Sequence, residues 1–434
     1  MSHNQCKAFA RNWQAVLSEY VKQAEEWTHS QQRHRKWSAE ALVQTLVLGC
    51  LERADTSLND FVQTAQALGV EISRSSLDER INERAVMLLA GVLHESLRQQ
   101  RPCPVQLAIR LQAFRSVNLV DSTQISVPEA LYAVFRGNGG KAKMKVQVGW
   151  EYLSGQLQVV ECEAGRTPDQ DSAVLEHFMV EGALVLFDLG YFKQERLRDM
   201  TQAGAFFVTR CQSQVALYAC DSGERVFLTD ILKQHPTDQY ESVFQLGGRV
   251  RTPVRVVARR VAPPAAAARR RHAKAKAKSE GKTCSAAYLI WLGWDILITN
   301  LPAEWSGDDL FILYGIRWQI ELVFKVWKSQ LGIARYGDWR TARVMCQFYA
   351  HLIGAVLCHQ SVACFRWLPG VMMSLAKSVA VIQHHMTSLL AVIQHDWAGL
   401  LRWASDLWSA FLRFAQHDKR KAAPTTLQFL MDWG

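Results

Sequence analysis

Three acidic residues in this sequence could together support metal-dependent phosphate chemistry. Asp121 and Asp188 each follow a short apolar segment, 116–120 and 183–187, that reads as a buried strand, whereas Glu321 lies in an amphipathic segment. Carboxylates without His or Cys partners suit hard cations such as Mg²⁺ or Mn²⁺. Two such ions, about 3.5–4 Å apart, can activate a nucleophile and stabilise the leaving oxygen of a phosphodiester. Each carboxylate alone could instead cap a helix or pair with an arginine, so the metal-site hypothesis depends on all three occurring together.

The segment 314–328 predicts one helix with two distinct faces. One face carries a single carboxylate among cations and aromatic rings. Four of its residues fall within roughly 60° of one another around the helix axis: Tyr314, Arg317, Glu321 and Lys328. Two more residues, Trp318 and Lys325, lie at the border of this face. A separate apolar stripe can pack on a core: Leu313, Ile316, Ile320, Val323, Trp327 and Leu331. The charge and hydrogen-bonding capacity of Tyr314, Arg317 and Lys328 suit phosphate contacts. The alternative is an ordinary solvated face, in which Glu321 and Lys325 form a surface pair.

The elements that must position these residues form a mixed α/β pattern. Two alternating segments, 145–150 and 156–161, predict a hairpin that turns at Ser154-Gly155. Two further helices are expected at 171–179 and 192–202. Three further strands are expected at 183–187, 205–210 and 294–301. Carboxylates at strand ends project into the crevice where such sheets keep their chemistry. The sequence has no glycine-rich phosphate-binding motif, so it predicts no nucleotide cofactor.

The first hundred residues predict helices only. Ser57 begins an amphipathic helix that Gly69 can end, and Ser76–Glu79 has the pattern of a capping box that starts a helix running towards Gln99. This order is the outline of a helix-turn-helix, although an ordinary helical hairpin fits equally well. Pro102 and Pro104 then mark a boundary.

Residues 211–293 predict a β-rich, basic insertion. Its middle, 263–278, is low in complexity and strongly cationic, so it is expected to be a mobile loop that either tracks DNA or keeps the surface soluble. Beyond Leu331, amphipathic helices are expected through 346–364, 370–393 and 397–414.

Composition indicates a globular protein that binds a polyanion. The 434 residues are 49% hydrophobic and carry a net charge of +10, which favours nucleic acid over an anionic membrane as partner. The ten cysteines contain no C-x-x-C pair and indicate buried thiols in a reducing compartment. The N-terminus lacks the apolar core of a signal peptide, and the apolar run 352–357 is too short to span a bilayer. A cytoplasmic location without membrane partners is therefore expected.

These residues resemble a known family. Tyr314-x2-Arg317-x3-Glu321-x6-Lys328 is similar to the Tyr–Arg–Glu–Lys signature of the IS-four family of insertion-sequence DDE transposases. The segments around Asp121 (Val-Asp-Ser-Thr) and Asp188 (Phe-Asp-Leu-Gly-Tyr) resemble those of the same family. The resemblance implies an RNase H-like, retroviral-integrase-like α/β core with a β-rich insertion and helical flanking domains. The boundaries expected are 1–103 (DNA-binding), 104–210 and 294–365 (core), 211–293 (insertion) and 366–434 (helical).

The resemblance also implies cut-and-paste DNA movement, through a DNA hairpin, at a site holding two Mg²⁺ ions that Mn²⁺ can replace. Asp121, Asp188 and Glu321 would hold the metal. Phosphates or an extruded base would contact the remaining site residues: Tyr314, Arg317, Trp318, Lys325, Lys328 and Trp294. The partners implied are terminal inverted repeats and target DNA, bound by a homodimer at the nucleoid. The alternative is a catalytically silent, domesticated DNA-binding protein, and a simple RNase H-like nuclease would not explain Tyr314, Arg317 and Lys328.

Overall fold

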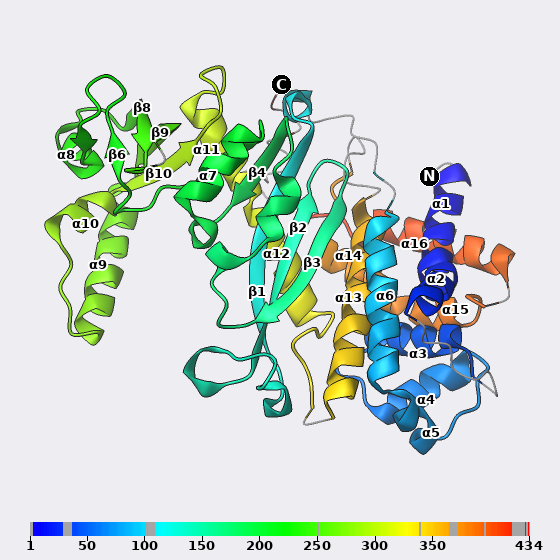
Figure 1. Ribbon diagram of the computed structural model, residues 1–434. Coiled ribbons are helices and arrows are strands. Elements are labelled where there is room, and N and C mark those ends of the chain that lie inside the picture. Colours follow the sequence, from blue (N-terminus) through cyan, green and yellow to red (C-terminus); the bar gives the residue numbers. More distant parts are fainter. Residues whose placement is uncertain are drawn as a thin grey trace. The chain divides into compact units, whose positions relative to one another are not determined.

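The computed structural model divides the chain by packing into two compact units (Figure 1). The residues that it describes are 3–28, 37–100, 102, 109–249, 251–337, 340–363, 371–394, 396–418, 430 and 433. We call Gln112–Asp121 with Pro168–Gln319 the sheet unit. We call Met1–Leu111, Ser122–Thr167 and Ile320–Gly434 the helical unit. The boundary crosses the chain within strand β1 (Ser116–Ser126) and near the start of helix α12 (Trp318–Ser329).

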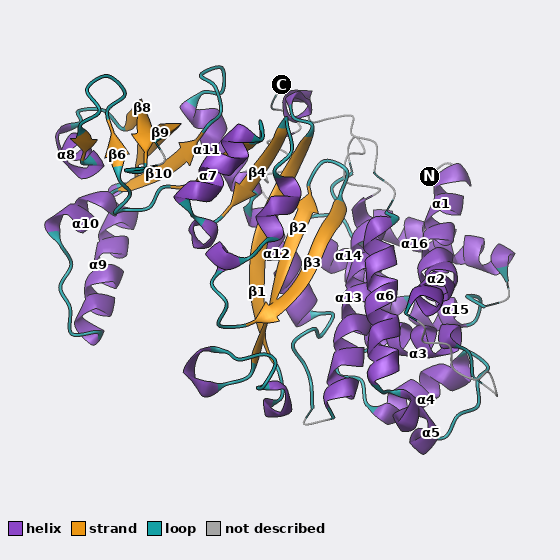
Figure 2. Cartoon of the chain, viewed as in Figure 1, coloured by secondary structure: helices purple, strands orange, loops and turns teal. Residues whose placement is uncertain are grey.

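The sheet unit contains a mixed sheet, as the alternation of strands and helices predicted. Its strands follow one another in the order β1, β4 (Ala183–Phe187), β5 (Phe206–Arg210), β10 (Trp294–Thr299), β9 (Thr252–Arg260), β8 (Gln239–Leu246), β6 (Leu217–Tyr218) and β7 (Arg225–Val226). The pairs β1–β4 and β4–β5 are parallel, and β10 is antiparallel to both β5 and β9. The strands of the predicted insertion therefore continue the sheet through β10 (Figure 2, orange).

Helices border this sheet. Their bounds are α7 (Gln194–Gln202), α8 (Leu228–Gln234), α9 (Pro263–Ser279), α10 (Ala286–Trp291) and α11 (Gly307–Ile316). Both α7 and α11 pack against β5. The helix predicted over 171–179 was wrong, because this segment holds only short 3₁₀ turns at Asp169–Asp171 and Val174–Phe178. Between these turns the Ser172 hydroxyl accepts a hydrogen bond from the Val174 N–H, a local bond that competes with helix formation.

The cationic run was also predicted wrongly as a loop. It forms α9, a helix of 17 residues that begins with two prolines, Pro263 and Pro264. Proline suits the first turn of a helix, and Ala, Arg and Lys have the highest helix propensities. Local propensity therefore makes a helix of a segment that buries almost no apolar surface, since Ala266 is its buried residue.

The helical unit joins the two ends of the chain in one bundle. Its helices are α1 (His3–Gln14), α2 (Tyr20–Trp27), α3 (Ala39–Glu52), α4 (Leu58–Ala67), α5 (Arg74–Arg80), α6 (Glu83–Arg98), α12, α13 (Thr341–Ala363), α14 (Leu375–His384), α15 (Met386–Leu390) and α16 (Trp397–Phe414). A π-helical stretch, Ala15–Glu19, joins α1 to α2. Helix α13 packs against both α3 and α6, and α1 packs against α16. The indole N–H of Trp13 donates to the Ser361 hydroxyl at 3.0 Å, which ties the first helix to α13.

The N-terminal helices begin at capping residues, one of which was predicted correctly and one wrongly. Helix α4 begins at the Ser57 capping box, and Gly69 follows it with φ of 74°, as predicted. The capping box predicted at Ser76 was wrong. Ser73 caps α5, and Asn82 caps a separate α6, because its extended backbone breaks the helix after Arg80.

The predicted hairpin is present in the helical unit as β2 (Lys143–Glu151) and β3 (Gln156–Ala164), which turn at Gly155 with φ of 76°. The apolar run 352–357 lies within the longer helix α13, which by length and composition alone could cross a membrane. Inside the protein, 72% of the apolar window of α13 is buried.

Candidate active site

The two aspartates lie side by side where the pairing of two parallel strands ends: Asp121 is inside β1, which continues to Ser126, and Asp188 directly follows β4. In the β1–β4 ladder Val120 pairs with Phe187, so the next residues along the two strands are Asp121 and Asp188. Every residue of β4 is buried, which explains its unbroken apolar sequence and fixes the strand end that carries Asp188. The side chain of Asp121 is 16% exposed. The sheet register therefore places these two residues next to each other, but the prediction that a strand ends at Asp121 was wrong, because β1 continues beyond it to Ser126.

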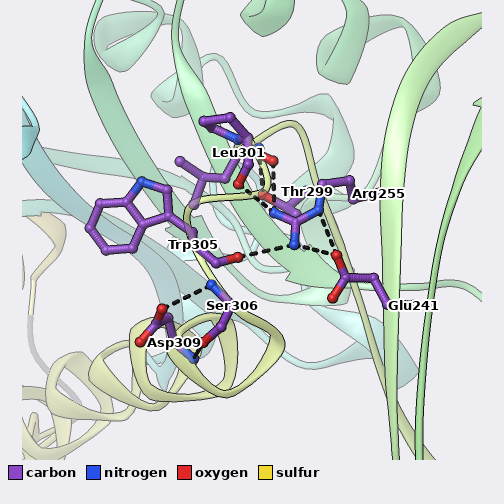
Figure 3. Close-up of polar contacts among 8 residues, drawn as sticks. Glu241, Arg255, Thr299, Leu301, Trp305, Ser306 and Asp309 are labelled. Atoms are coloured by element: carbon purple, nitrogen blue, oxygen red, sulfur yellow. Dashed lines mark hydrogen bonds and ion pairs between the residues drawn. The ribbon is translucent and has the colours of Figure 1, made fainter.

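Helix α11 brings Tyr314 and Arg317 to these aspartates. A capping box starts the helix, in which Ser306 Oγ accepts from the Asp309 N–H and the Asp309 carboxylate accepts from the Ser306 N–H (Figure 3). Leu313 and Ile316 are fully buried, as the predicted apolar stripe requires. These anchors fix the direction in which the end of α11 points.

The single helix predicted over 314–328 is in fact two helices that meet at Arg317. Helix α11 ends at Ile316 and α12 begins at Trp318, and the Arg317 N–H bonds to the Tyr314 carbonyl three residues earlier. The apolar stripe continues across the junction, because each of its members is at most 3% exposed.

Tyr314 and Arg317 contact the two aspartates directly. Arg317 Nη1 donates a hydrogen bond to Asp121 Oδ2 at 2.8 Å. The Tyr314 hydroxyl donates to Asp188 Oδ1 at 3.0 Å. The Arg317 side chain is only 9% exposed. The pair therefore combines a nearly buried cation with a carboxylate, so each charge offsets part of the other's desolvation.

The Tyr314 ring lies near two guanidinium groups. The central carbon of Arg317 is 5.5 Å from the ring centroid, and that of Arg210, at the end of β5, is 5.8 Å from it. Burial and the Asp188 carboxylate both raise the pKa of the Tyr314 hydroxyl well above its usual range, so it remains a hydrogen-bond donor at neutral pH. Arg210 was missed in the sequence, although it is a cation that ends the predicted strand 205–210, the next strand after the one that Asp188 follows.

The donor chemistry of this site fits a divalent cation. Asp121 and Asp188 present carboxylate oxygens, which are the ligands that Mg²⁺ and Mn²⁺ prefer. The described residues contain no group of three or more His, Cys, Asp or Glu side chains that could hold a metal ion. The sheet unit thus supplies two of the three predicted ligands, and both accept hydrogen bonds from the signature residues Tyr314 and Arg317.

The other predicted site residues of α12 belong to the helical unit. Glu321 is partly exposed, Lys325 is exposed, and Lys328 is partly buried. Burial lowers the pKa of the Lys328 ammonium group from its ordinary value. All three lie on α12, with Glu321 in its first turn and Lys328 in its last.

The two tryptophans predicted to stack on an extruded base differ in accessibility. Trp318 is 55% exposed, whereas Trp294 is 4% exposed. The guanidinium of Arg260 lies 4.3 Å from the centroid of the Trp294 ring, and His235 packs against the same ring. A base could reach Trp294 only after Arg260 moved, whereas Trp318 is accessible as it stands.

A buried arginine that the sequence did not single out holds the start of α11. Arg255, on β9, donates to the backbone carbonyls of Leu301, Pro302 and Trp305 and forms an ion pair with Glu241 on β8 (Figure 3). This network fixes the loop between β10 and α11, and hence the helix that carries Tyr314.

This chain is similar to known transposases. Residues 112–357 match the family described as the transposase DDE domain, which is more than half of the 434 residues. The transposase for insertion sequence element IS231F of Bacillus thuringiensis subsp. israelensis is 27% identical over 347 residues, which cover 73% of this chain and 72% of that protein. The transposase for insertion sequence element IS231E of Bacillus thuringiensis subsp. finitimus is 26% identical over 385 residues, which cover 82% of this chain and 80% of that protein. A solved structure of the piggyBac transposase synaptic complex with hairpin DNA aligns with a TM-score of 0.44 at 12% identity, covering 99% of this chain and 84% of that one, a similarity too low to support an argument.

Proposed function

This chain belongs to the transposase DDE domain family, and from that membership we propose that it excises and inserts an insertion sequence by a cut-and-paste reaction. The family makes it an enzyme of DNA cleavage and strand transfer. The observation that carries the residue assignment is the pairing of Arg317 with Asp121 and of Tyr314 with Asp188, two aspartates that directly follow the last paired residues of β1 and β4. This pairing supports the hypothesis that the four residues form one site.

The DDE family implies a divalent metal, and we assign Asp121, Asp188 and Glu321 as its ligands, with two Mg²⁺ ions per site. The bound ions would supply nucleophile activation and stabilisation of the leaving oxygen. Within the chain, Tyr314 and Arg317 hold the carboxylates in place, and Arg317 has the same fork of donors for a phosphate as for a carboxylate. Lys325 and Lys328 on α12 supply further positive charge for the DNA backbone.

The proposed fold and assembly follow from the same family. The parallel order β1, β4, β5 supports an RNase H-like core. We further place the chain in the IS-four branch, on the spacing of its Tyr–Arg–Glu–Lys signature, with the N-terminal helices of 1–103 binding the terminal inverted repeat and two copies holding paired ends. Hairpin formation is assigned to Trp318, whose exposed ring can stack on an extruded base.

The experiment that tests this function uses a duplex carrying the element's own terminal inverted repeat, incubated with the protein and Mg²⁺ and resolved on a denaturing gel. Nicks at the element's end followed by hairpins and double-strand breaks are expected. Specific binding of the same duplex without any strand cleavage would favour the alternative, a silent and domesticated DNA-binding protein.

A further inference from the structure

A second cationic surface lies in the sheet unit, away from Asp121 and Asp188. It is a groove of about 820 Å³, lined by α9, by α10, by the loop between them and by the segment that leads into α8. In Figure 1, helices α8, α9 and α10 lie at the left, near β6, and α8 packs against α10. We call it the α9–α10 groove. Its volume is in the range of pockets that hold small organic ligands, which run from about 300 to 1,000 Å³.

Exposed aromatic rings line this groove. Phe227 is 57% exposed and Tyr288 is 40% exposed, and Trp291 also faces the groove. Small residues of α9 and α10, Ala273, Ala277 and Ala287, leave room for a flat ring to approach. Exposed apolar side chains that gather in one place and are rimmed by polar residues are typical of a binding surface.

The charge of the groove is positive. Arg225, Lys276 and Lys282 line it, and its acidic residue, Glu280, forms an ion pair with Lys282 at 3.2 Å. The Arg225 guanidinium lies 5.1 Å from the centroid of the Phe227 ring, whose side chain is still exposed. Lys276 is exposed and stands on the groove side of α9. Such a combination of exposed rings and cations is the pattern by which proteins hold single-stranded nucleic acid, because every base has a face that can stack and every linkage carries a negative charge.

We propose that the α9–α10 groove binds an unpaired stretch of DNA, with bases stacked on Phe227 and Tyr288 and phosphates on Arg225 and Lys276. Duplex DNA fits less well, because its bases are stacked on one another and present no free face to a ring. The proposal rests on the proposed function, since cutting and joining of DNA ends leaves unpaired strands that need a place to lie.

Helix α9 supplies its own matched control. At about 100° per residue, Lys276 lies on the face that also carries Ala273, whereas Lys274 and Lys278 fall on the opposite face. All three lysines are exposed, and they share one helix and one charge. Binding through the groove depends on Lys276 alone of the three, whereas general electrostatic attraction would depend on all of them equally.

The test measures binding of the full-length protein to a duplex that ends in a six-nucleotide unpaired tail carrying 2-aminopurine, whose fluorescence falls when it stacks. Wild type should quench the probe and bind the tailed duplex more tightly than a blunt one. Tyr288→Ala and Phe227→Ala should each abolish much of the quenching and weaken tail-dependent binding at least fivefold. Lys276→Ser should make the plot of log affinity against log salt shallower by about 0.7, the value for one single-strand phosphate.

Lys278→Ser and Phe414→Ala, the latter on α16 of the helical unit, should leave tail-dependent binding and quenching unchanged. Equal effects of Lys276→Ser and Lys278→Ser, or unchanged quenching in Tyr288→Ala and Phe227→Ala, would overturn the groove proposal. Cleavage of the element's end by wild type, measured in parallel, separates the two hypotheses: cutting without groove-dependent binding rejects the groove alone, whereas no cutting rejects the proposed function. Circular dichroism of each variant confirms that it is folded.

Discussion

At the scale of single residues, the signature side chains are bonded to the carboxylates with which they share the site. The sequence suggested that Tyr314 and Arg317 meet phosphates, and the structure shows them on Asp188 and Asp121. The two roles are compatible, because a guanidinium and a phenol bind carboxylate and phosphate oxygens by the same hydrogen bonds. In the protein without DNA, these contacts balance the charge of Asp121 and give each aspartate a fixed partner.

Tyr314→Phe should remove one hydrogen bond to a carboxylate and lower the free energy of unfolding at pH 7 by about 1.5–3 kcal/mol. The raised pKa of Tyr314 also makes the free energy of unfolding depend on pH. In the unfolded chain the phenol loses its proton from about pH 10, whereas in the folded protein it keeps the proton to higher pH. The stability that Tyr314 contributes is therefore present below about pH 10 and is lost as the pH rises further. Urea unfolding at pH 7 to 11 should therefore show a flatter alkaline decline for Tyr314→Phe than for wild type. An identical decline, or an equal effect from the exposed control Tyr132→Phe, would contradict this assignment.

Trp318→Ala should separate two steps of the proposed reaction. Extruding a base costs a few kcal/mol of stacking, and an aromatic platform returns about 1–3 kcal/mol. The first nick should be nearly intact and hairpin formation slow, and an abasic residue at the extruded position should partly restore the hairpin rate. Trp397→Ala, a second exposed tryptophan, should change neither step. Equal loss of nicking and hairpin formation in Trp318→Ala, without abasic rescue, would indicate that its ring serves packing instead.

At the scale of elements, the sequence predicted the strands well because their signals are local. The apolar run of β4 and the turn at Gly155 are readable without any knowledge of their partners. The errors came from choices between close alternatives, such as Ser73 against Ser76 as a cap, or from a composition that suits both loop and helix, as in α9. The contacts of Tyr314 and Arg317 join residues 126 and 196 positions apart, and no local pattern encodes such contacts.

The loop that begins α11 depends on Arg255. Arg255→Ala should remove the guanidinium that donates to the carbonyls of Leu301 and Trp305 and destabilise the protein by roughly 3 kcal/mol or more, the range for breaking a buried polar network. Arg255→Lys should recover only part of this stability, because an ammonium cannot reproduce the fork of donors. Urea unfolding measures the change, with the exposed Arg249→Ala as control. A loss below 1 kcal/mol would show that the network does not hold α11.

At the scale of the whole molecule, the chain is divided in a way that the sequence did not reveal. The helices from the two ends of the chain form one bundle, and the insertion's strands extend the sheet of the other unit. The sequence suggested a core in two parts, 104–210 and 294–365, with an insertion between them and a separate helical domain at each end. The unit boundary falls between Gln319 and Ile320, so Asp121 and Asp188 belong to the sheet unit and Glu321 belongs to the helical unit.

The central claim is that Asp121, Asp188 and Glu321 are the metal-binding residues of a transposase, and Glu321→Gln tests it most directly. This change keeps the side-chain volume and removes a charged ligand, while the proposed phosphate contacts do not depend on it. Wild type, Glu321→Gln and the exposed control Glu304→Gln are compared for binding to the element's end and for its cleavage in Mg²⁺ on a denaturing gel. The account predicts that all three bind with equal affinity and that Glu321→Gln alone makes no nick. Cleavage by Glu321→Gln at the wild-type rate would contradict it.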